Sequence, residues 1–442
     1  MTEAFERGDF TQLHATVIAP GLCTRCGACA GICPHGAITI ASCDSLPVVD
    51  ASLCTHCGRC LPSCPGQGYP VTAWTAARGA PADADPTWGP VHGIWRGYAC
   101  DAEIRAAAAS GGIATALLCY CLAAGLVDEV VVVTLEAGQP VVRFTDDPAV
   151  VTAAVGSKYA PVPLLQTVLP ALRERPRRIA LTATPCQLAG WYRATTLLPR
   201  LREYLVLAIG LFCGHVQTTD SLTAIGSTIN VRYPDAATFV GWRCGPYPGC
   251  ARFVTPEGEV REKPLYPWLD IAVPFFTPQR CFLCPDGGNW LSDLTLGDIH
   301  AGGTDETVVI ARTAHGQQVL AAARDAGVLT YTAMTDAEKR ATVVTGITRS
   351  KLRAGLERIA WHQRKGLPAP EFDYAPAVMC RAKIPGQTPG LLKYLLAMWW
   401  RHPGRLAWLR RHPRLLEWLG RQLYRFPTAL PGYRLLRRLR RG

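Results

Sequence analysis

The stretch CTRCGACAGICP (residues 23–34) decides the fold of the first part of the chain, and CTHCGRCLPSCP (residues 54–65) repeats its pattern. In each stretch, three cysteines are separated by two residues, and a fourth follows after three more residues and precedes a proline. Three thiolates at this spacing can bind three corners of one 4Fe-4S cubane, while the fourth is carried towards a second cluster. The pattern therefore predicts two 4Fe-4S clusters that exchange one ligand each.

This exchange assigns the cysteines to two groups. We predict one cluster on Cys23, Cys26, Cys29 and Cys64, and the other on Cys54, Cys57, Cys60 and Cys33. The alternatives are a pair of zinc knuckles or a disulfide framework. Zinc sites usually take two pairs of ligands, often with histidine, and do not require three evenly spaced cysteines before a Cys-Pro step. The spacing thus favours iron–sulfur ligation.

The rest of the composition places the chain in a reducing compartment. A length of 442 residues allows two or three domains, and the 19 cysteines suit the cytoplasm better than a secreted protein. The N-terminal segment MTEAFERGDFTQLHA carries acidic residues and no apolar core, so we expect neither a secretory signal nor a transit peptide. No apolar run reaches the roughly 18 residues that a membrane-spanning helix needs. We predict a cytoplasmic protein.

The formal net charge of +12 is concentrated at one end of the chain. Residues 393–442 hold 13 Lys and Arg and one acidic residue, Glu417, so the remaining chain is neutral. A nucleic-acid-binding protein would be expected to carry its basic excess on a recognised binding domain. We therefore do not expect nucleic acid as a partner.

Hydrophobic patterning divides the chain into four parts and predicts an α+β fold. Residues 1–75 form a ferredoxin-like domain with a strand at 37–41, and 76–90 are expected to be a linker rich in Pro, Gly, Ala and Asp. An α/β body follows at 91–372, and a basic helical tail at 373–442. Within the body, buried strands are expected at 128–135, 177–184 and 203–212, and helices at 104–125 and 187–198.

Six segments of the body place glycine, cysteine and proline at the ends of these elements. They are SGGIATALL (110–118), GSKYAP (156–161), ATPCQLAG (183–190), IGLFCGH (209–215), CFLCPDGGNWLSDLTLGDI (281–299) and RKGLPAP (364–370). In this order and spacing they resemble the beta-subunit family of the coenzyme F420 hydrogenases and dehydrogenases, which also includes flavin-dependent reductases of chlorophyll intermediates. The resemblance covers about residues 91–372 and implies a body that binds FAD and a cluster of its own.

The resemblance places a third 4Fe-4S cluster on four dispersed cysteines, Cys186, Cys213, Cys281 and Cys284. The residues agree with this, because Cys186 and Cys213 each follow an apolar strand and could meet at one edge of a sheet. Alternatively, Cys186 and Cys213 are buried small side chains, and the C-x2-C pair binds zinc with His215 or His300. His215 is either a proton donor or a structural histidine.

By the same resemblance, the FAD contacts are Ser110, Gly111, Gly112, Thr115, Lys158 and Tyr159. The Ser-Gly-Gly segment could open a helix whose N–H groups face the pyrophosphate, and Lys158 would add a positive charge. The alternative is a pair of glycines that only permits close packing. No G-x-G-x-x-G fingerprint follows a strand, so a nicotinamide site is not expected.

The basic tail contains the related units RHPGRLAWLR (401–410) and RHPRLLEWLG (411–420). Prolines suit the first turn of a helix, so we predict short helices broken at Pro403, Pro413 and Pro427. Arginine with tryptophan and leucine on such helices is typical of a segment that lies in a membrane interface, here residues 391–442. Docking on an acidic partner and packing on the body are the alternatives.

Together these features predict an iron–sulfur flavoprotein oxidoreductase. It would pass electrons between ferredoxin, or another redox protein, and an organic acceptor, through 4Fe-4S clusters and FAD. The acceptor would be a deazaflavin coenzyme or another small or lipid-like substrate. The alternatives are a non-catalytic relay protein within a larger redox complex and a ferredoxin-dependent reductase of a tetrapyrrole. Peripheral attachment to the inner face of the membrane would follow from the tail.

Overall fold

A computed structural model describes residues 9–79, 81, 88–235, 237–299, 306–345, 347–374, 389–400 and 402–429. His300, which was an alternative zinc ligand, lies outside these residues. So do the last part of the basic tail, 430–442, and residues 80 and 82–87 of the predicted linker. At the two ends of that linker, a helix reaches to Ala77 and the side chain of Trp88 is buried.

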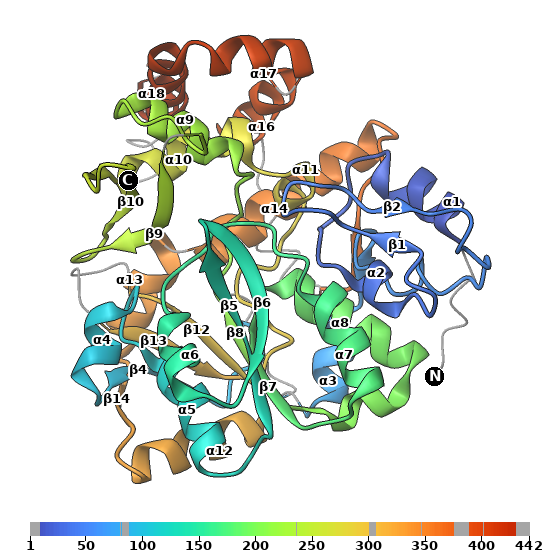
Figure 1. The fold of residues 1–442 in the computed structure, drawn as a ribbon, viewed down its shortest axis with the longest axis vertical. Helices are drawn as coiled ribbons and strands as arrows, with labels where there is room; N and C mark the ends of the chain where they lie inside the picture. Colours follow the sequence, from blue (N-terminus) through green and yellow to red (C-terminus); the bar gives the residue numbers. More distant parts are fainter. Residues whose placement is uncertain are drawn as a thin grey trace, which may run out of the picture.

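An eight-stranded mixed sheet, in the order β14-β4-β13-β12-β8-β7-β5-β6, forms the centre of the body (Figure 1). The neighbours β12, β8, β7 and β5 run parallel, and the outer pairs are antiparallel. The predicted strands at 128–135, 177–184 and 203–212 are confirmed as β5, β7 and β8. The strands are β4 (Gly93–Ala99), β5 (Glu129–Glu136), β6 (Gln139–Thr145), β7 (Ile179–Ala183), β8 (Leu205–Leu211), β12 (Leu294–Asp298), β13 (Thr307–Ala311) and β14 (Leu329–Ala333).

Helices cover both faces of this sheet because its central strands are apolar on both sides. Val131 packs into the core under one face, whereas its neighbours Val130 and Val132 pack into the core under the other, as the two-residue period of a strand requires. The first face is covered by α7 (Leu164–Glu174) and α8 (Pro185–Leu197), followed by the 3-10 turn η2 (Pro199–Glu203). The second is covered by α5 (Ile113–Ala123), α6 (Pro148–Ala153) and α12 (Ala314–Asp325).

The single helix predicted at 104–125 is wrong, because two helices lie there: α4 (Ala102–Ala107) and α5. Between them, Gly111 passes so close to β4 that a Cβ atom would lie 2.6 Å from the carbonyl oxygen of Gly97. Gly112 has a φ of 78°, a left-handed conformation that glycine adopts easily. This conformation turns the chain away from β4 immediately before α5. The helix predicted at 187–198 is confirmed as α8, which begins two residues earlier at Pro185.

The ferredoxin-like domain packs against α7 and α8 and is joined to the body by backbone contacts. Gly31 approaches α7 so closely that a Cβ atom there would lie 2.0 Å from the carbonyl oxygen of Leu165. The predicted strand at 37–41 is confirmed at its centre as β1. The elements are α1 (Phe10–Leu13), the π-helical turn η1 (His14–Ile18), α2 (Ala28–Ile32), β1 (Ile38–Thr39), β2 (Val48–Val49), β3 (Gly68–Tyr69) and α3 (Val71–Ala77), and β3 pairs with β15 (Glu371–Phe372).

A second sheet of three antiparallel strands, β11-β10-β9, forms a smaller layer with its own apolar core. Its strands are β9 (Thr238–Cys244), β10 (Cys250–Val254) and β11 (Val260–Pro264), and its helices are α9 (Asp220–Thr228) and α10 (Leu265–Phe276). A short helix, α11 (Gln279–Phe282), follows this layer in the chain, and two further helices, α13 (Asp336–Thr345) and α14 (Ile347–Arg364), follow β14.

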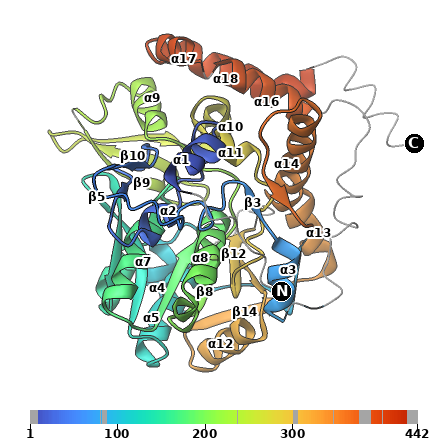
Figure 2. The same ribbon diagram turned by 90° about the vertical axis from the view of Figure 1, so that its right-hand side faces the viewer.

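The described part of the tail forms the outermost layer, above α9, α10 and α14 (Figures 1 and 2). It consists of α16 (Pro389–Trp400), α17 (Pro403–Arg410) and α18 (Pro413–Ala429). Two helices start at the predicted prolines, but the break predicted at Pro427 is wrong. A proline removes one backbone donor, and α18 tolerates this near its end, as α7 tolerates Pro170 and α10 tolerates Pro274.

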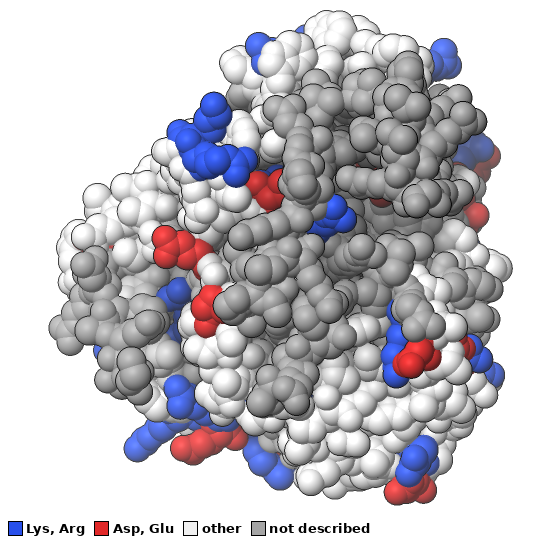
Figure 3. All heavy atoms as spheres, turned by 180° about the vertical axis from the view of Figure 1, so that it is seen from behind, with Lys and Arg blue, Asp and Glu red and all other residues white. Residues whose placement is uncertain are grey.

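None of the described helices combines the length and the apolar character that crossing a bilayer requires. Seen from behind, the described surface of the body carries basic and acidic side chains next to one another (Figure 3). The even mixture agrees with the balanced charge of the chain outside its tail.

Candidate redox site

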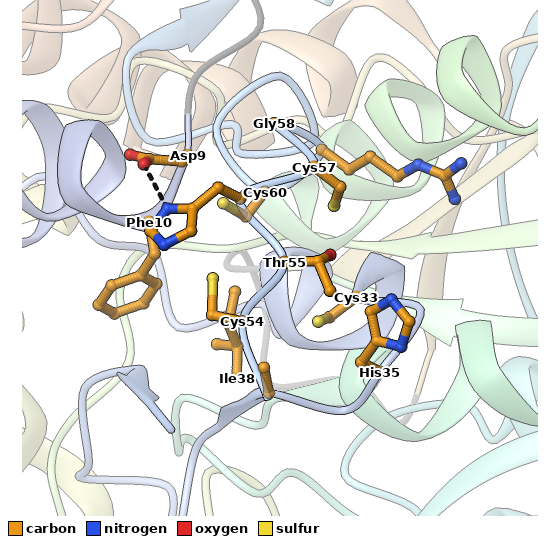
Figure 4. A pocket seen from close by; sticks show the side chains of 13 residues that line it. Asp9, Phe10, Cys33, His35, Ile38, Cys54, Thr55, Cys57, Gly58 and Cys60 are labelled. Carbon is orange, nitrogen blue, oxygen red and sulfur yellow. Dashed lines mark hydrogen bonds and ion pairs between the residues drawn. The ribbon is translucent and has the colours of Figure 1, made fainter. Parts of the chain in front are cut away.

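Four of the predicted ligands surround an open pocket of about 350 Å³ at the surface of the ferredoxin-like domain. Their sulfur atoms point into one common space (Figure 4). These four are the predicted group Cys33, Cys54, Cys57 and Cys60, here called the pocket group. At the rim, Nδ1 of His56 lies 2.9 Å from a carboxylate oxygen of Asp9, and Cys57 is exposed to solvent. The chain therefore brings the exchanged cysteine, Cys33, to the group that the spacing predicted.

The other predicted group, Cys23, Cys26, Cys29 and Cys64, lies deeper in the same domain and is here called the deeper group. Burial, followed by the neighbouring thiols of Cys64, Cys23 and Cys26, raises the pKa of Cys29 well above its usual value. Backbone N–H groups already point at two of the sulfurs: that of Arg25 lies 3.4 Å from Cys23 Sγ, and that of Gly66 lies 3.3 Å from Cys64 Sγ.

Unsatisfied polar atoms beside this deeper group fit a bound cluster. Arg25 Nε and Nη1 are buried and have no hydrogen-bond partner among the described residues, and the Thr24 side chain interacts with the thiol of Cys26. Sulfide and thiolate sulfurs of a cluster accept such bonds, and these contacts help to set its reduction potential. A thiol that binds a metal is deprotonated outright, so the raised pKa values of the free thiols do not oppose ligation.

The third group, Cys186, Cys213, Cys281 and Cys284, forms at the carboxyl-terminal edge of the parallel strands. Cys186 follows β7 in the first turn of α8, and Cys213 follows β8, so the parallel pairing of β7 and β8 brings them to the same edge, as predicted. Burial raises the pKa of Cys186, and the nearby thiols of Cys213, Cys26 and Cys281 raise it further. Burial also raises the pKa of Cys213 to about 11, with Cys281 and Cys284 close by.

Two charged or titratable side chains lie against this third group. The ammonium of Lys351, on α14, donates to the carbonyl oxygen of Cys213 at 2.7 Å and lies 3.9 Å from Cys213 Sγ. Burial lowers the pKa of His215 to about 4, so the imidazole is neutral at pH 7. His215 Nε2 has no partner in the described part of the chain. The neutral ring does not support the role of His215 as a proton donor.

Within the described residues, no three His, Cys, Asp or Glu side chains converge closely enough to hold a single metal ion. A cubane spaces its thiolates more widely, because each one binds a different iron atom. The three four-cysteine groups therefore suit clusters better than single ions, and each offers four thiols, the number of ligands that a 4Fe-4S cluster takes.

The predicted FAD contacts form two neighbouring segments. In the first, the Ser110 hydroxyl and the Gly111 N–H lie 3.0 and 2.9 Å from Thr307 Oγ1. The helix α5 then starts at Ile113 after the N-cap residue Gly112, without a capping side chain from the described residues, and Thr115 in its first turn is buried. The uncapped N–H groups of this turn are the kind of donors that bind phosphate.

Lys158 and Tyr159 form the second segment, and Lys158 has an arrangement that the sequence did not suggest. Its ammonium donates to three backbone carbonyls at the end of α6, those of Ala154, Val155 and Gly156, at 2.8–3.1 Å. Burial lowers the pKa of Lys158 to about 8. Tyr159 packs edge-on against Trp242 with ring centroids 5.9 Å apart, and burial raises its pKa.

Arg243 joins the two segments. This buried side chain donates to the carbonyl oxygen of Ala109, just before Ser110, and pairs with Asp298 at the end of β12. Its guanidinium carbon lies 5.2 Å from the Tyr247 ring centroid. Its positive charge partly opposes the effect of burial, which raises the pKa of Tyr159. Arg243 Nε is buried and has no partner among the described residues. A planar ligand with polar edges could use this free donor.

Sequence reasoning missed Arg243, Tyr247 and Lys351. Asp298 lies within the quoted segment 281–299 and could have been singled out there as the polar residue that ends a buried strand. Arg243 offered no such signal, because it lies outside all six segments. Its φ of 61°, unusual for arginine, turns the end of β9 towards the Ser-Gly-Gly segment.

Comparisons with known proteins match both the ferredoxin-like domain and the body. Two family models describe the beta subunits of the coenzyme F420 hydrogenases and dehydrogenases: the model of their N-terminal part matches residues 94–168, and the model of their C-terminal part matches residues 176–337. Two models described as "4Fe-4S binding domain" match residues 16–39 and 46–69.

Two relatives align with most of their own length. One of the subunits of the F(420)H(2) dehydrogenase of Methanosarcina mazei is 25% identical over 70% of this chain and 85% of its own length. The beta subunit of the coenzyme F420 hydrogenase of Methanothermobacter thermautotrophicus is 25% identical over 61% of this chain and 94% of its own.

The fold is similar to that of a chain in the F420-reducing NiFe hydrogenase complex of Methanosarcina barkeri. The TM-score is 0.52 with 20% identity, over 66% of this chain and 99% of that one. From the two family models and the two cluster-binding domains, we conclude that this iron–sulfur protein belongs to the coenzyme F420 hydrogenase/dehydrogenase beta-subunit family.

Proposed function

We propose that the chain is an iron–sulfur flavoprotein oxidoreductase that passes electrons between a ferredoxin-type protein and an organic acceptor. The observation that carries the proposal is the serial arrangement of the three four-cysteine groups, from an open pocket to the centre of the body. When bound, the clusters supply one-electron transfer, and FAD supplies the conversion between single electrons and electron pairs.

The three groups lie near one another in order from the surface pocket to the body. Cys60 of the pocket group lies near enough to Cys29 of the deeper group to raise the pKa of the Cys29 thiol. The N–H of Leu165, on α7, donates to the carbonyl oxygen of Cys26 at 3.0 Å. A Cβ atom on Gly190, one turn after Cys186 on α8, would lie 3.1 Å from Cys26 Sγ. The glycine therefore lets the deeper group approach the third group closely.

Arginines hold the ferredoxin-like domain in this position. Arg173 donates to the carbonyl oxygens of Ile32 and Cys33 at 3.2 Å. Arg280, next to Cys281, donates to the carbonyl oxygen of Gly66 at 2.9 Å. Both arginines belong to the body and bind backbone beside the predicted ligands of the ferredoxin-like domain, and this fixes the spacing between the groups.

The proposed FAD site comprises Ser110, Gly111, Gly112, Thr115, Lys158 and Tyr159, to which we add Arg243. The uncapped turn of α5 and the free Arg243 Nε support it. Lys158 has the weakest support, because its three donors are already engaged. The acceptor is proposed to be a deazaflavin coenzyme, since both relatives named above carry coenzyme F420 in their names.

A second candidate is a relay protein without substrate turnover of its own. It is favoured by the fact that both of these relatives are named as subunits. Such a relay would hand its electrons to a partner protein instead of to a small molecule.

Anaerobic steady-state assays separate the two candidates. With reduced ferredoxin as donor and coenzyme F420 as acceptor, an enzyme reduces the coenzyme at a constant rate, whereas a relay protein reduces only artificial dyes. A protein that contains neither flavin nor electron-accepting clusters would contradict both candidates.

We further propose that the chain works at the cytoplasmic face of a membrane, to which its basic tail attaches it. The charge excess of residues 393–442 supports attachment to an anionic surface.

A further inference from the structure

The described tail helices present two different faces. One face packs on the body: Leu409 and Leu416 are fully buried, and both belong to the apolar core that contains Ile271 and Phe275 of α10. The exposed surface of the tail carries one tryptophan on each of the three helices. Trp399, Trp408 and Trp418 have exposed fractions of 51%, 48% and 54%.

Helix geometry explains the separation in α18. Leu416 and Gly420 lie one turn apart on the face against α10, and a Cβ atom on Gly420 would lie 2.2 Å from Ile271 Cγ2. Trp418 stands two residues from each of them, which is about 200° around the helix. It therefore points away from the body.

The same relation holds in α16. Tyr394 and Ala397 are fully buried, and Tyr394 contacts His362 of α14 through a hydrogen bond of 2.6 Å. Trp399 lies two residues beyond Ala397 and is exposed. Packing of the tail on the body thus buries Leu409, Leu416, Ala397 and Tyr394 but leaves the three tryptophans exposed.

Positive charge surrounds these tryptophans. Arg405, Arg411 and Arg414 are exposed, and the Arg405 guanidinium carbon lies 4.0 Å from the Trp399 ring centroid. Glu417, the acidic residue within 393–442, pairs with Lys263 of β11 and with Arg421, so its charge is neutralised at the body. In Figure 3 the described atoms at the upper end of the molecule, which carries the tail, are mostly white with blue side chains at the margins.

We propose that Trp399, Trp408 and Trp418, here called the tryptophan face, insert into the headgroup region of an anionic lipid bilayer while the neighbouring arginines contact lipid phosphates. Tryptophan is enriched at this depth because its ring is apolar and its N–H remains solvated. The basic excess complements anionic lipid. This inference deepens the proposed membrane attachment and rests on it, but it is independent of the proposed redox chemistry.

Removal of the whole tail would be a poor test of this role. A chain that ends near Phe372 would uncover the apolar surface of α10 that Leu409 and Leu416 bury, and so would be expected to lose stability for reasons unrelated to lipid. Substitution of the exposed tryptophans leaves the packed face intact and changes only the outward surface.

The test uses the full chain, purified anaerobically, with vesicles of phosphatidylcholine alone or mixed with phosphatidylglycerol. The wild-type protein is expected to sediment with the mixed vesicles and not with pure phosphatidylcholine. The triple variant Trp399→Ser, Trp408→Ser, Trp418→Ser should bind at least about ten-fold more weakly, because each ring loses its apolar contact with lipid. Raising the salt concentration should weaken wild-type binding several-fold without abolishing it.

A matched control replaces hydrophobic side chains of similar exposure elsewhere. Val260 and Leu367 are 57% and 43% exposed, and Val260→Ser with Leu367→Ser should bind vesicles as the wild type does. A second variant, Arg411→Gln with Arg414→Gln, should lose mainly the salt-sensitive part of binding.

Three results would overturn the proposal: wild-type protein that ignores the mixed vesicles, a triple tryptophan variant that binds them normally, or a triple variant that instead releases a bound polypeptide. Iron content and dye reduction are measured in parallel. If these are normal while vesicle binding is absent, only the membrane inference fails. If they are absent while binding persists, only the redox proposal fails.

Discussion

The pocket group and the third group each offer four cysteine thiolates, but their surroundings are opposite. The pocket group opens to solvent, with Cys57 exposed and the Asp9–His56 pair at its rim. The third group lies at the buried edge of the parallel strands, with the Lys351 ammonium 3.9 Å from Cys213 Sγ. Because ligand identity is the same, access and electrostatics must distinguish the two sites.

In the proposed function, this difference gives the two sites different tasks. An exposed cluster can be approached by a partner protein, whereas a buried one is shielded from solvent and oxidants. Burial disfavours the more negative, reduced form of a cluster, and a nearby cation favours it. Lys351 therefore offsets part of the effect of burial on the third group.

The largest expected effect comes from breaking the buried site. Cys281→Ser should remove about 4 of about 12 iron atoms and reduce ferredoxin-driven turnover to the background rate, because the series loses its last member. Iron analysis and an anaerobic turnover assay measure both. Cys121→Ser, which replaces a buried cysteine of α5 outside every group, should retain all the iron. Retention of all the iron in Cys281→Ser would remove that residue from the ligands.

Breaking the exposed site should separate entry of electrons from the chemistry in the body. Cys57→Ser is expected to slow reduction by ferredoxin about 100-fold or more, since the pocket group is the exposed one. Small dyes, which can reach the body directly, should still reduce the flavin. Stopped-flow absorbance at the flavin band follows both reactions. Equal slowing with ferredoxin and dye would show that the pocket is not the point of access.

A smaller effect is expected from the cation beside the third group. Lys351→Met should lower the reduction potential of the third cluster by roughly 60 mV, which corresponds to a ten-fold change for one electron. An anaerobic redox titration followed by electron paramagnetic resonance gives the value. Lys365→Met is the control, because Lys365 is exposed just beyond the end of α14, 14 residues further along the chain. Equal shifts in the two variants would argue against a local effect of Lys351.

The smallest effect is expected for Lys158. Since its ammonium is held by three carbonyls, Lys158→Ala should weaken FAD binding by less than about ten-fold, as removal of one indirect charge would. Flavin fluorescence on dilution measures the dissociation constant, with Lys339→Ala as a surface control. Unchanged affinity would remove Lys158 from the site, and the flavin proposal would then rest on the α5 turn and Arg243.

The sequence predicted the two ferredoxin-type groups well because their cysteines follow one local spacing. It also predicted the meeting of Cys186 and Cys213, because parallel neighbours end at the same edge of a sheet. Lys351 and Arg243 could not be predicted in this way. Lys351 reaches Cys213 from 138 residues further along the chain, and Arg243 is placed by an unusual backbone conformation.

The tail shows the same limit. Its alternation of leucine, tryptophan and arginine predicted amphipathic helices, and Pro403 and Pro413 marked two of their starts correctly. Amphipathicity alone does not say whether an apolar face packs on the body or on lipid. Only the position of α10 shows that Leu409 and Leu416 pack against the body while the tryptophans stay exposed.

The most direct test of the central claim is the iron, zinc and flavin content of the anaerobically purified wild-type chain. Three four-cysteine groups in series beside a flavin site predict about 12 iron atoms, a matching amount of acid-labile sulfide, and one FAD per chain. A chain with about 8 iron atoms, zinc in place of the third cluster, and no flavin would contradict the account.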